Sequence, residues 1–340
     1  MRRLITLCLC LFTLLNSYMA KAESAFSQRA DVRTFISKMV KAHGFKKAEL
    51  IKVMNEVQLQ PKIIESMDKP FEKKTWDVYK ELFLTSERVQ AGMEFWRANS
   101  LALEKAEKQF GVPANIIVAN IGVETLYGKH QGTYRVLDAL STLAFEYPKR
   151  SPFFTKELGE FLLLCREHGV APTLYLGSYA GAMGKPQFMP SSYRYYATNY
   201  RTNPKIDLMN DDTAVIASVA NYFHKHGWKM NQGIAQPAEV VGSGYRTINT
   251  TNKIASYPMQ QMQKAGIKPL TAALNVPAKV GLIELTTQTG QEFWLTYPNF
   301  YVITRYNSSP QYAMAVYLLS QQLKTHWAKT GAKAKKFAYV

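Results

Sequence analysis

The chain of 340 residues has few cysteines and histidines, and their positions exclude several kinds of site. Two of its three cysteines, Cys8 and Cys10, lie near the N-terminus, and Cys165 lies in an apolar run where a buried, inert thiol is expected. If the N-terminal segment is removed, one cysteine remains and no intramolecular disulfide can form. The six histidines show no metal-ligand spacing, since His224 and His226 are two apart and face different sides of a helix. We therefore expect no metal and no cofactor.

Other absences narrow the choice of function further. Beyond the N-terminus no stretch is long and apolar enough to cross a membrane, and there is no internal repeat or low-complexity segment. The glycine-containing stretch from Gly181 to Pro186 lacks the spacing of a phosphate-binding loop. Ser178 lacks the Gly-x-Ser-x-Gly turn of a serine hydrolase. Neither a nucleotide-binding enzyme nor a serine hydrolase is supported.

Acidic residues are scarce relative to basic ones. The chain has 25 Asp and Glu against 42 Lys and Arg, which gives a formal net charge of +17. Such a charge attracts anionic partners. Inside a cell the partner would be nucleic acid, whereas for an exported protein the better candidates are the cell wall and anionic membrane surfaces.

The first 22 residues have the features of a secretory signal. Arg2 and Arg3 precede a short apolar run, and Ala20-Lys21-Ala22 supplies the small-x-small cleavage pattern. We expect cleavage after Ala22 and a soluble, periplasmic protein with a formal charge of +14. Each early cysteine follows a leucine, where a lipoprotein signal needs a small residue, so a lipid anchor is the less favoured alternative.

The hydrophobic pattern predicts an α+β fold that is mainly α. Apolar residues at helical spacing predict helices from Val32 to Val57, from Ser86 to Phe110 and from Phe153 to His168. After Asn231, alternating Gly, Pro, Thr and Val predict a small β-rich insertion with a hairpin turn at Gln288-Thr289-Gly290-Gln291. A last helix from Gln311 to Trp327 is expected to return to the helical domain.

Glu124 is the most informative single residue. It follows the uncharged stretch from Val112 to Ala119, in which Pro113 suits the first turn of a helix that carries Glu124 near its C-terminal end. Apolar neighbours disfavour the ionised carboxylate and raise its pKa. A carboxylic acid that stays protonated near neutral pH can donate a proton to a leaving group. The alternative is a solvent-facing glutamate, which is the more common case for a lone residue.

Six segments together resemble the lytic transglycosylase B family, the membrane-bound lytic murein transglycosylases. They occur in order between about residues 76 and 320, and residues 24–75 match only weakly. The motifs are long and specific. They are Ile121–Thr125, Leu137–Leu143, Gly177–Gly184, Gln187–Tyr193, Ser218–Phe223 and Asn299–Asn307.

The resemblance implies a lysozyme-like helical core with a flanking helical region and a small inserted β-rich domain. It also implies cleavage, without water, of the β-1,4 bond between N-acetylmuramic acid and N-acetylglucosamine in peptidoglycan, which yields 1,6-anhydromuramoyl products. The expected segments are a signal peptide at 1–22, an N-terminal helical region at 23–80, the catalytic core at 81–230, the β-rich insertion at 231–305, the C-terminal helix at 306–327 and a basic tail at 328–340.

The residues fit this chemistry. Ordinary glycosidases use two carboxylates, and no convincing second one is found, because Asp138 is expected to be a helix cap and Glu146 a loop charge. One glutamate is enough if the substrate supplies the nucleophile. Glu124 would protonate the glycosidic oxygen and then accept the proton of the sugar's own 6-hydroxyl as that hydroxyl attacks C1. Holding the hydroxyl in place and excluding water favours ring closure over hydrolysis.

The resemblance also implies a set of substrate-binding residues and partners. Ser178 and Gln187 would contact the sugar at the cleavage point, while Tyr306 and Asn307 would orient the N-acetyl group and the glutamate. The expected partners are peptidoglycan glycan strands, a cell-wall synthesis complex and, through the positive charge, a membrane surface, with no nucleic acid. The other implied positions are the aromatic cleft residues Tyr79, Tyr222 and Tyr312 and the basic pair Lys149 and Arg150, which would contact the stem peptide.

One stretch departs from the family pattern. Some members carry a calcium loop where this chain has Asn199 to Asp207. Calcium loops need several acidic oxygens and a glycine at the sharp turn, but Arg201 occupies a ligand position here and Pro204 the turn. We expect no metal at 199–212, and helix capping explains Asp211-Asp212 better than ligation.

Two alternatives to the lyase remain. A muramidase of the same fold would use Glu124 as the acid and a fixed water as the nucleophile. A wall-binding scaffold protein that has lost activity would need no acid at all. A nucleic-acid binder would explain the charge but not the export signal.

Overall fold

The computed structural model describes residues 25–68, 74–200, 205–271 and 277–337. The predicted signal peptide lies outside these residues, as does the middle of the degenerate calcium loop. The chain divides into two compact units, one formed by Met1–Met67 with Thr133–Gly181 and the other by Asp68–Gly132 with Ala182–Val340. Each unit is therefore built from two separate stretches of sequence.

The first unit is mainly helical. Helix α9 (Val136–Glu146) packs against α10 (Ser151–His168), and α2 (Ala30–His43) packs against α3 (Lys47–Asn55). The helical pattern predicted from Val32 to Val57 forms two helices, because Gly44 takes a left-handed conformation (φ 66°) that ends α2. The remaining elements are η1 (Phe26–Gln28), α4 (Pro61–Asp68), η3 (Pro148–Arg150) and the antiparallel pair of β1 (Tyr134–Arg135) and β2 (Leu176–Gly177).

Polar contacts join the two stretches of the first unit. Asp138 accepts the backbone N–H of Gln58 at 2.9 Å, and Arg29 forms an ion pair with Glu146. The unit therefore cuts across the predicted boundary between the N-terminal region and the catalytic core. A pattern of local helices does not reveal such pairings, because each joins residues about 80 or more positions apart.

The predicted local roles of Asp138 and Glu146 are wrong. Asp138 is the third residue of α9, whose N-cap is Arg135, and Glu146 is the last residue of the same helix. Asp138 is 3% exposed and forms an ion pair with Arg135 at 2.6 Å. A buried carboxylate needs such a partner, because an unpaired buried charge is strongly destabilising. Both acids thus serve to hold the unit together.

Helix α8 (Ala114–Thr125) is the central helix of the second unit. It packs against four helices, and every one of its residues except Glu124 is buried. A mostly apolar helix that is buried on every side belongs in the interior of a domain. Pro113 is its N-cap, and Leu126 ends it with a positive φ of 49°. The four neighbours are α6 (Ser86–Ala98), α7 (Ser100–Phe110), α12 (Asp212–Lys225) and α15 (Pro310–Phe337).

The helix predicted from Ser86 to Phe110 is two helices. The break falls at Asn99, whose side-chain Nδ2 donates to the Phe95 carbonyl at 3.0 Å. Asparagine side chains compete in this way with the helical hydrogen bonds. Thr85, not Ser86, is the N-cap, and its hydroxyl accepts the N–H of Arg88 at 3.1 Å. The predicted end at Gly111 is confirmed by its left-handed conformation.

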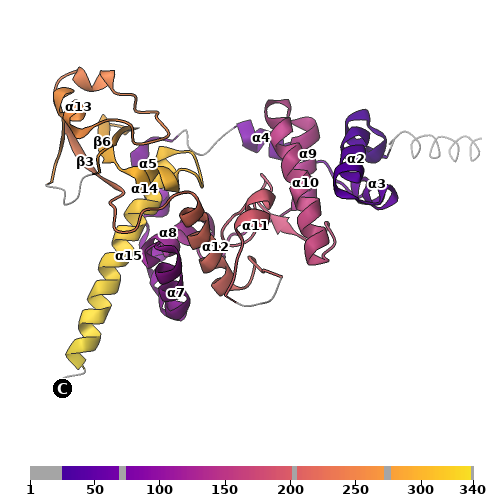
Figure 1. Cartoon of the computed structure of the whole chain (residues 1–340), viewed down its shortest axis with the longest axis horizontal. Helices are drawn as coiled ribbons and strands as arrows, with labels where there is room; N and C mark the ends of the chain where they lie inside the picture. The colour runs from indigo at the N-terminus through magenta and orange to yellow at the C-terminus, as the bar shows by residue number, and fades with distance from the viewer. Residues whose placement is uncertain (1–24, 69–73, 201–204, 272–276, 338–340) are drawn as a thin grey trace, which may run out of the picture. The chain divides into compact units, whose positions relative to one another are not determined.

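The β-rich part predicted after Asn231 is confirmed. Its four strands form an antiparallel sheet in the order β4-β3-β6-β5, with a small core around Met262, Ile267 and Leu295. Figure 1 shows β3 and β6 beside α13 (Met259–Lys264) in this orange part of the chain. The strands are β3 (Ala235–Val240), β4 (Ile267–Pro269), β5 (Gly281–Thr286) and β6 (Gln291–Thr296). The short helix η4 (Gly244–Thr247) lies between β3 and β4, and α14 (Pro298–Ile303) follows β6.

The last helix is longer than the pattern predicts. Helix α15 continues to Phe337, so part of the basic tail expected at 328–340 is helical, as the long yellow helix in Figure 1 shows. Alanine and lysine, which are frequent there, are strong helix formers. Its first turns pack on α8. Within the described residues no helix has both the length and the apolar character to cross a bilayer.

The second unit has two further short helices. Helix α5 (Trp76–Phe83) meets the sheet through Glu292 on β6, which accepts the Trp76 Nε1–H at 3.0 Å and pairs with Lys80 at 3.2 Å. Helix α11 (Pro190–Tyr196) packs on α12. Asp211 caps α12 as predicted, because its side chain accepts the N–H groups of Thr213 and Ala214.

Candidate active site

Glu124 lies at the C-terminal end of α8, and its side chain is half-buried. Burial raises the pKa of its carboxyl group from 4.5 to about 7, and a hydrogen bond from Tyr312 acts in the opposite direction. No other carboxylate of the described residues contributes to this pKa. Because the pKa is close to neutral, the group can both give and accept a proton, as acid–base catalysis requires. The predicted raised pKa of Glu124 agrees with this environment.

Tyr312 brings a hydroxyl group to the carboxyl. It lies in the first turn of α15, is 3% exposed, and donates to Glu124 Oε1. The same hydroxyl lies 3.0 Å from the Asn120 Oδ1 atom, one turn earlier on α8. Burial, and then the nearby Glu124 carboxylate, raise the Tyr312 pKa well above its usual value. The hydroxyl is therefore neutral and has a single proton to share between two acceptors.

Two further tyrosines, Tyr222 and Tyr306, lie near the Glu124 carboxyl group. The Tyr306 hydroxyl donates to the Pro186 carbonyl, and the Tyr222 hydroxyl donates to the Arg305 carbonyl, each at 2.6 Å. Their ring centroids are 4.8 Å apart. Burial is the main cause of the raised pKa of both, and Glu124 contributes to each. The acid is thus faced by neutral hydroxyls and aromatic rings, which give a weakly polar environment.

The loop after Glu124 is held in an unusual backbone conformation. Leu126 and Tyr127 both have positive φ, which is rare for residues other than glycine. The Thr125 hydroxyl donates to the Lys185 carbonyl at 2.8 Å and accepts the Gly128 N–H at 3.0 Å. Strained residues of this kind persist only where the surroundings fix them. The loop therefore gives Glu124 a defined position.

Gln187 fixes a neighbouring turn. It also has a positive φ (51°), and its side-chain Nε2 donates to the carbonyls of Gly184 and Gln131 at 2.9 and 3.1 Å. Both amide hydrogens are therefore used within the protein. Gln187 therefore stabilises the turn beside the Glu124 loop. Only its Oε1 atom could accept a hydrogen bond from a sugar.

Two more predicted residues of the second unit, Tyr79 and Asn307, make other contacts. Tyr79 is 2% exposed, packs its ring near Phe83 at 5.0 Å, and contributes to the raised pKa of Tyr312. Asn307 accepts the Ser309 N–H at 3.0 Å through Oδ1, which is the bond of a turn before α15. The second unit therefore brings Glu124 together with Tyr222 from α12, Tyr306 from the loop between α14 and α15, and Tyr312 from α15.

Three predicted substrate-binding residues belong to the first unit. The Ser178 hydroxyl oxygen accepts the Ala180 N–H at 3.3 Å in the turn after β2. Lys149 and Arg150 are exposed on η3, and the Arg150 guanidinium lies 4.6 Å from the centroid of the Phe153 ring. An exposed cationic pair beside aromatic rings suits an anionic or peptide ligand.

The described part of the chain holds no group of three or more His, Cys, Asp or Glu side chains that could bind a metal ion. Of the two acids near the degenerate calcium loop, Asp211 caps α12. Asp212 is not a cap, because it pairs with Lys185 at 2.5 Å. Arg201 and Pro204 of that loop lie outside the described residues.

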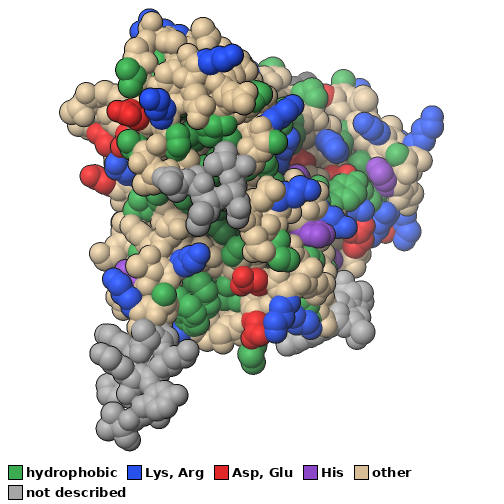
Figure 2. Space-filling view, turned by 60° about the vertical axis from the view of Figure 1, so that its left-hand side comes forward, with side chains coloured by type: hydrophobic (Ala, Val, Ile, Leu, Met, Phe, Trp, Pro, Cys, Tyr) green, Lys and Arg blue, Asp and Glu red, His purple; other side chains and the backbone are tan. Residues whose placement is uncertain are grey.

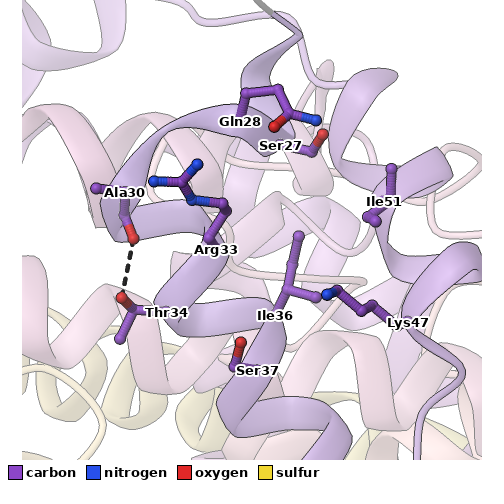
Figure 3. Close-up of a pocket in the computed structure, with 9 residues that line it drawn as sticks. All are labelled: Ser27, Gln28, Ala30, Arg33, Thr34, Ile36, Ser37, Lys47 and Ile51. Atoms are coloured by element: carbon purple, nitrogen blue, oxygen red, sulfur yellow. Dashed lines mark hydrogen bonds between the residues drawn. The ribbon is translucent and has the colours of Figure 1, made fainter.

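A surface hollow of about 620 Å³ lies in the first unit, between η1, α2 and α3. Figure 3 shows Arg33 and Lys47 at its edges and the hydrogen bond from the Thr34 hydroxyl to the Ala30 carbonyl, 2.8 Å long, along α2. None of the predicted site residues lines it.

Sequence reasoning missed Asn120. It is fully buried, and its place one helical turn before Glu124 puts both side chains on one face of α8. The signal was present, since Asn120 is an amide in an otherwise apolar stretch close to the acid. Its contact with Tyr312 was not visible, because the two residues are 192 positions apart.

A half-buried acid at the end of a core helix, faced by tyrosines, is typical of lysozyme-like enzymes, which cleave glycosidic bonds by acid–base catalysis. Residues 27–321 match the family profile described as the transglycosylase SLT domain. The chain belongs to this family.

Known lytic transglycosylases are similar to this protein over most of the chain. It is 38% identical over 306 residues to membrane-bound lytic murein transglycosylase B of Escherichia coli K12, a match that covers 87% of this chain and 83% of the relative. The structure of lytic transglycosylase SltB1 from Pseudomonas aeruginosa is 40% identical, with a TM-score of 0.83 and coverage of 88% and 99%. SltB3 from the same organism, in complex with NAG-NAM-pentapeptide, is 26% identical, with a TM-score of 0.74 and coverage of 88% and 80%.

Proposed function

We propose that Glu124 is the acid and then the base of this protein, which, as a member of its family, is a lytic transglycosylase acting on peptidoglycan. The reaction is cleavage of the β-1,4 bond between N-acetylmuramic acid and N-acetylglucosamine, with 1,6-anhydromuramoyl ends as products. The observation that carries the proposal is the half-buried Glu124 carboxyl, whose pKa of about 7 suits both roles. The complex of the relative SltB3 with NAG-NAM-pentapeptide supports the substrate class.

The proposed reaction has two proton transfers. Protonated Glu124 donates to the glycosidic oxygen as the C1–O bond breaks, and positive charge develops at C1 of the muramic acid. The 6-hydroxyl oxygen of the same sugar then bonds to C1, and its proton goes to the Glu124 carboxylate. Glu124 ends in its starting state, and no water is consumed.

The surroundings of Glu124 support this use of one carboxylate. A second carboxylate would act as the nucleophile or as the base for a water, yet no described acid other than Glu124 contributes to the pKa of this site. Asp138 and Glu146 are instead engaged by Arg135 and Arg29. The substrate's own hydroxyl therefore replaces the missing group, and the tyrosines around Glu124 limit access of water.

Substrate binding is proposed at the positions implied by the family motifs. Tyr306 and Asn307 orient the N-acetyl group and the acid, Gln187 contacts the sugar through its side-chain carbonyl oxygen, and Ser178 contacts it from the turn after β2. Tyr79, Tyr222 and Tyr312 supply the aromatic side of the cleft. Lys149 and Arg150 contact the acidic stem peptide.

Positive charge suits the proposed location. Lys and Arg side chains are spread over the face seen in Figure 2 and are not gathered in one patch. Such a distribution favours general attraction to an anionic wall or membrane surface over a nucleic-acid groove. We propose a periplasmic protein released by cleavage after Ala22, without a lipid anchor, that acts on glycan strands alone or within a cell-wall synthesis complex.

The test is mass spectrometry of peptidoglycan digested with the wild type, with Glu124→Gln and with the control Glu104→Gln. Glu104 is an exposed residue of α7 that pairs with Lys108 at 2.6 Å. The wild type and the control should release anhydromuropeptides, and Glu124→Gln should release about 10³-fold less or none, since its amide cannot donate a proton in this way.

Each alternative has its own result. Reducing ends without anhydro sugar from the wild type would identify a muramidase. Wall binding with no soluble product from the wild type would identify an inactive scaffold. Equal amounts of product from the wild type and from Glu124→Gln would show that Glu124 takes no part in the reaction.

A further inference from the structure

Asn120 is a buried polar residue that packing alone does not explain. Asn120 is 0% exposed on a helix whose other residues are mostly apolar, and its Nδ2 group has no well-formed hydrogen bond within the described residues, only a weak interaction with the buried Tyr306 hydroxyl. A buried N–H without a partner destabilises a fold. Leucine has a similar volume and would fill this space without that cost. The amide is therefore explained better by what its oxygen does.

The Asn120 oxygen faces the hydroxyl that also serves the acid. Asn120 Oδ1 lies 3.0 Å from the Tyr312 hydroxyl, which is also in hydrogen-bond contact with Glu124 Oε1. A tyrosine hydroxyl has one proton. At any moment it can donate fully to only one of these two acceptors. The Tyr312 hydroxyl can therefore donate its proton either to Glu124 or to Asn120.

We propose that Asn120 is a positioning residue that gives the Tyr312 hydroxyl a second acceptor, so that Tyr312 donates to Glu124 when the acid is ionised and turns to Asn120 when the acid is protonated. The proposal rests on the proposed role of Glu124. No covalent bond changes, because the hydroxyl only rotates about its C–O bond. Tyr312 leaves the protonated acid free to donate to the glycosidic oxygen and supports the carboxylate that forms.

The strength of the two acceptors supports this rotation. A carboxylate is a stronger acceptor than an amide oxygen, because hydrogen bonds to charged groups are the stronger ones. A neutral carboxylic acid has lost that advantage. Asn120 therefore stabilises the protonated state of Glu124 more than the ionised state. The other titratable groups that face Glu124 are Tyr222 and Tyr306, which stay neutral, and the Asn120 amide acts only weakly on Tyr306 against the effect of burial.

Asn120→Leu removes the second acceptor. We expect the pKa of Glu124 to fall by about 0.5–1 unit, the size of one ordinary hydrogen bond. From a pKa of about 7, the protonated fraction at pH 7 falls about two- to five-fold, and kcat should fall with it while KM changes little. The melting temperature should change little, because the variant also removes a buried N–H that has no well-formed hydrogen bond.

Asn115→Leu is the matched control. Asn115 lies on the same helix and is 8% exposed, but its Nδ2 donates to the Ser320 carbonyl at 3.3 Å, away from Tyr312. Loss of that bond should lower the melting temperature and leave the pKa of Glu124 unchanged. A general effect of placing leucine in α8 would appear in both variants.

The readout is the carboxyl ¹³C shift of Glu124 in glutamate-labelled full-length protein, titrated by NMR and assigned by its loss in Glu124→Gln. It needs no substrate, so it judges Asn120 even if the digestion assay rejects the lyase. A lower pKa in Asn120→Leu supports the proposal, and an unchanged or higher pKa overturns it. Asn120→Ala, which also lacks an acceptor, carries the same expectation if the leucine is not accommodated.

A double-mutant cycle tests the route through Tyr312. In a Tyr312→Phe background no hydroxyl remains to be shared, so Asn120→Leu should leave the pKa of Glu124 unchanged. A shift of the same size in both backgrounds would mean that Asn120 acts on Glu124 without Tyr312, and the proposal would be rejected.

Discussion

Replacement of Glu124 by glutamine should make the protein more stable at alkaline pH although it removes the proposed acid. In the folded protein burial raises the Glu124 pKa from 4.5 to about 7. The unfolded chain has the ordinary value. Between these two pKa values the folded state holds a proton that the unfolded chain has lost, and such a difference links stability to pH.

The sign and size follow from this difference. Below about pH 4.5 the group is protonated in both states and costs nothing. As pH rises toward 7, ionisation in the buried site is increasingly unfavourable, so the wild type loses stability, and above 7 the loss is constant. A shift of about 2.5 units corresponds to ~3 kcal/mol. Because the side chain is half-buried, we expect Glu124→Gln to exceed the wild type by about 2–3 kcal/mol at pH 8 and to equal it at pH 4.5.

Scanning calorimetry of the two proteins at pH 4.5, 6 and 8 measures the effect as a difference in melting temperature. Glu104→Gln is the control, because Lys108 lowers the pKa of this exposed acid. Its removal should therefore give a small change of opposite sign above pH 4.5. Parallel pH dependence of the wild type and Glu124→Gln would show that Glu124 titrates normally, and the assignment of a buried acid would then be wrong.

Two substitutions around Glu124 give further expectations. Tyr312→Phe removes the hydrogen bond that lowers the Glu124 pKa, so the upper limb of the pH profile of muropeptide release should move up by about one unit. A limb that stays in place would show that this hydroxyl does not support the carboxylate. Gly122→Ala would place a Cβ atom 2.4 Å from the Tyr127 hydroxyl oxygen, and it should destabilise the protein by about 1–3 kcal/mol in calorimetry. In the control Gly159→Ala the nearest atoms are the sulfur of the flexible Met39 side chain at 3.3 Å and Phe35 Cε2 at 4.0 Å, and an equal loss in both variants would argue against the Tyr127 contact.

Local signals predicted several helix ends correctly. Gly111 and Gly169 end α7 and α10 in left-handed conformations, and Asp211 caps α12, as their residue types suggest. The break at Asn99 was missed because the apolar spacing continues across it. There a side chain that bonds to the Phe95 carbonyl outweighs the helical pattern.

The grouping of the helices into units was less accessible to sequence reasoning. The N-terminal helices and α9–α10 form one unit through pairings such as Asp138 with Gln58. Hydrophobic periodicity shows which face of a helix is buried but not which helix covers it. The predicted segment boundaries and the substrate-binding residues stay predictions until they are tested with ligand.

Sequence by itself determined that Glu124 is an acid at the end of an otherwise uncharged and mostly apolar helix, and this composition alone predicts poor hydration and a raised pKa. Only the tertiary structure decided what faces the acid. Tyr312 reaches Glu124 across 188 positions because α15 packs on α8, and Asn120 reaches the same hydroxyl from the turn below. Burial depends on the number of apolar neighbours, which composition reports, whereas a hydrogen bond depends on atoms placed within about 3 Å, which only the packed fold provides.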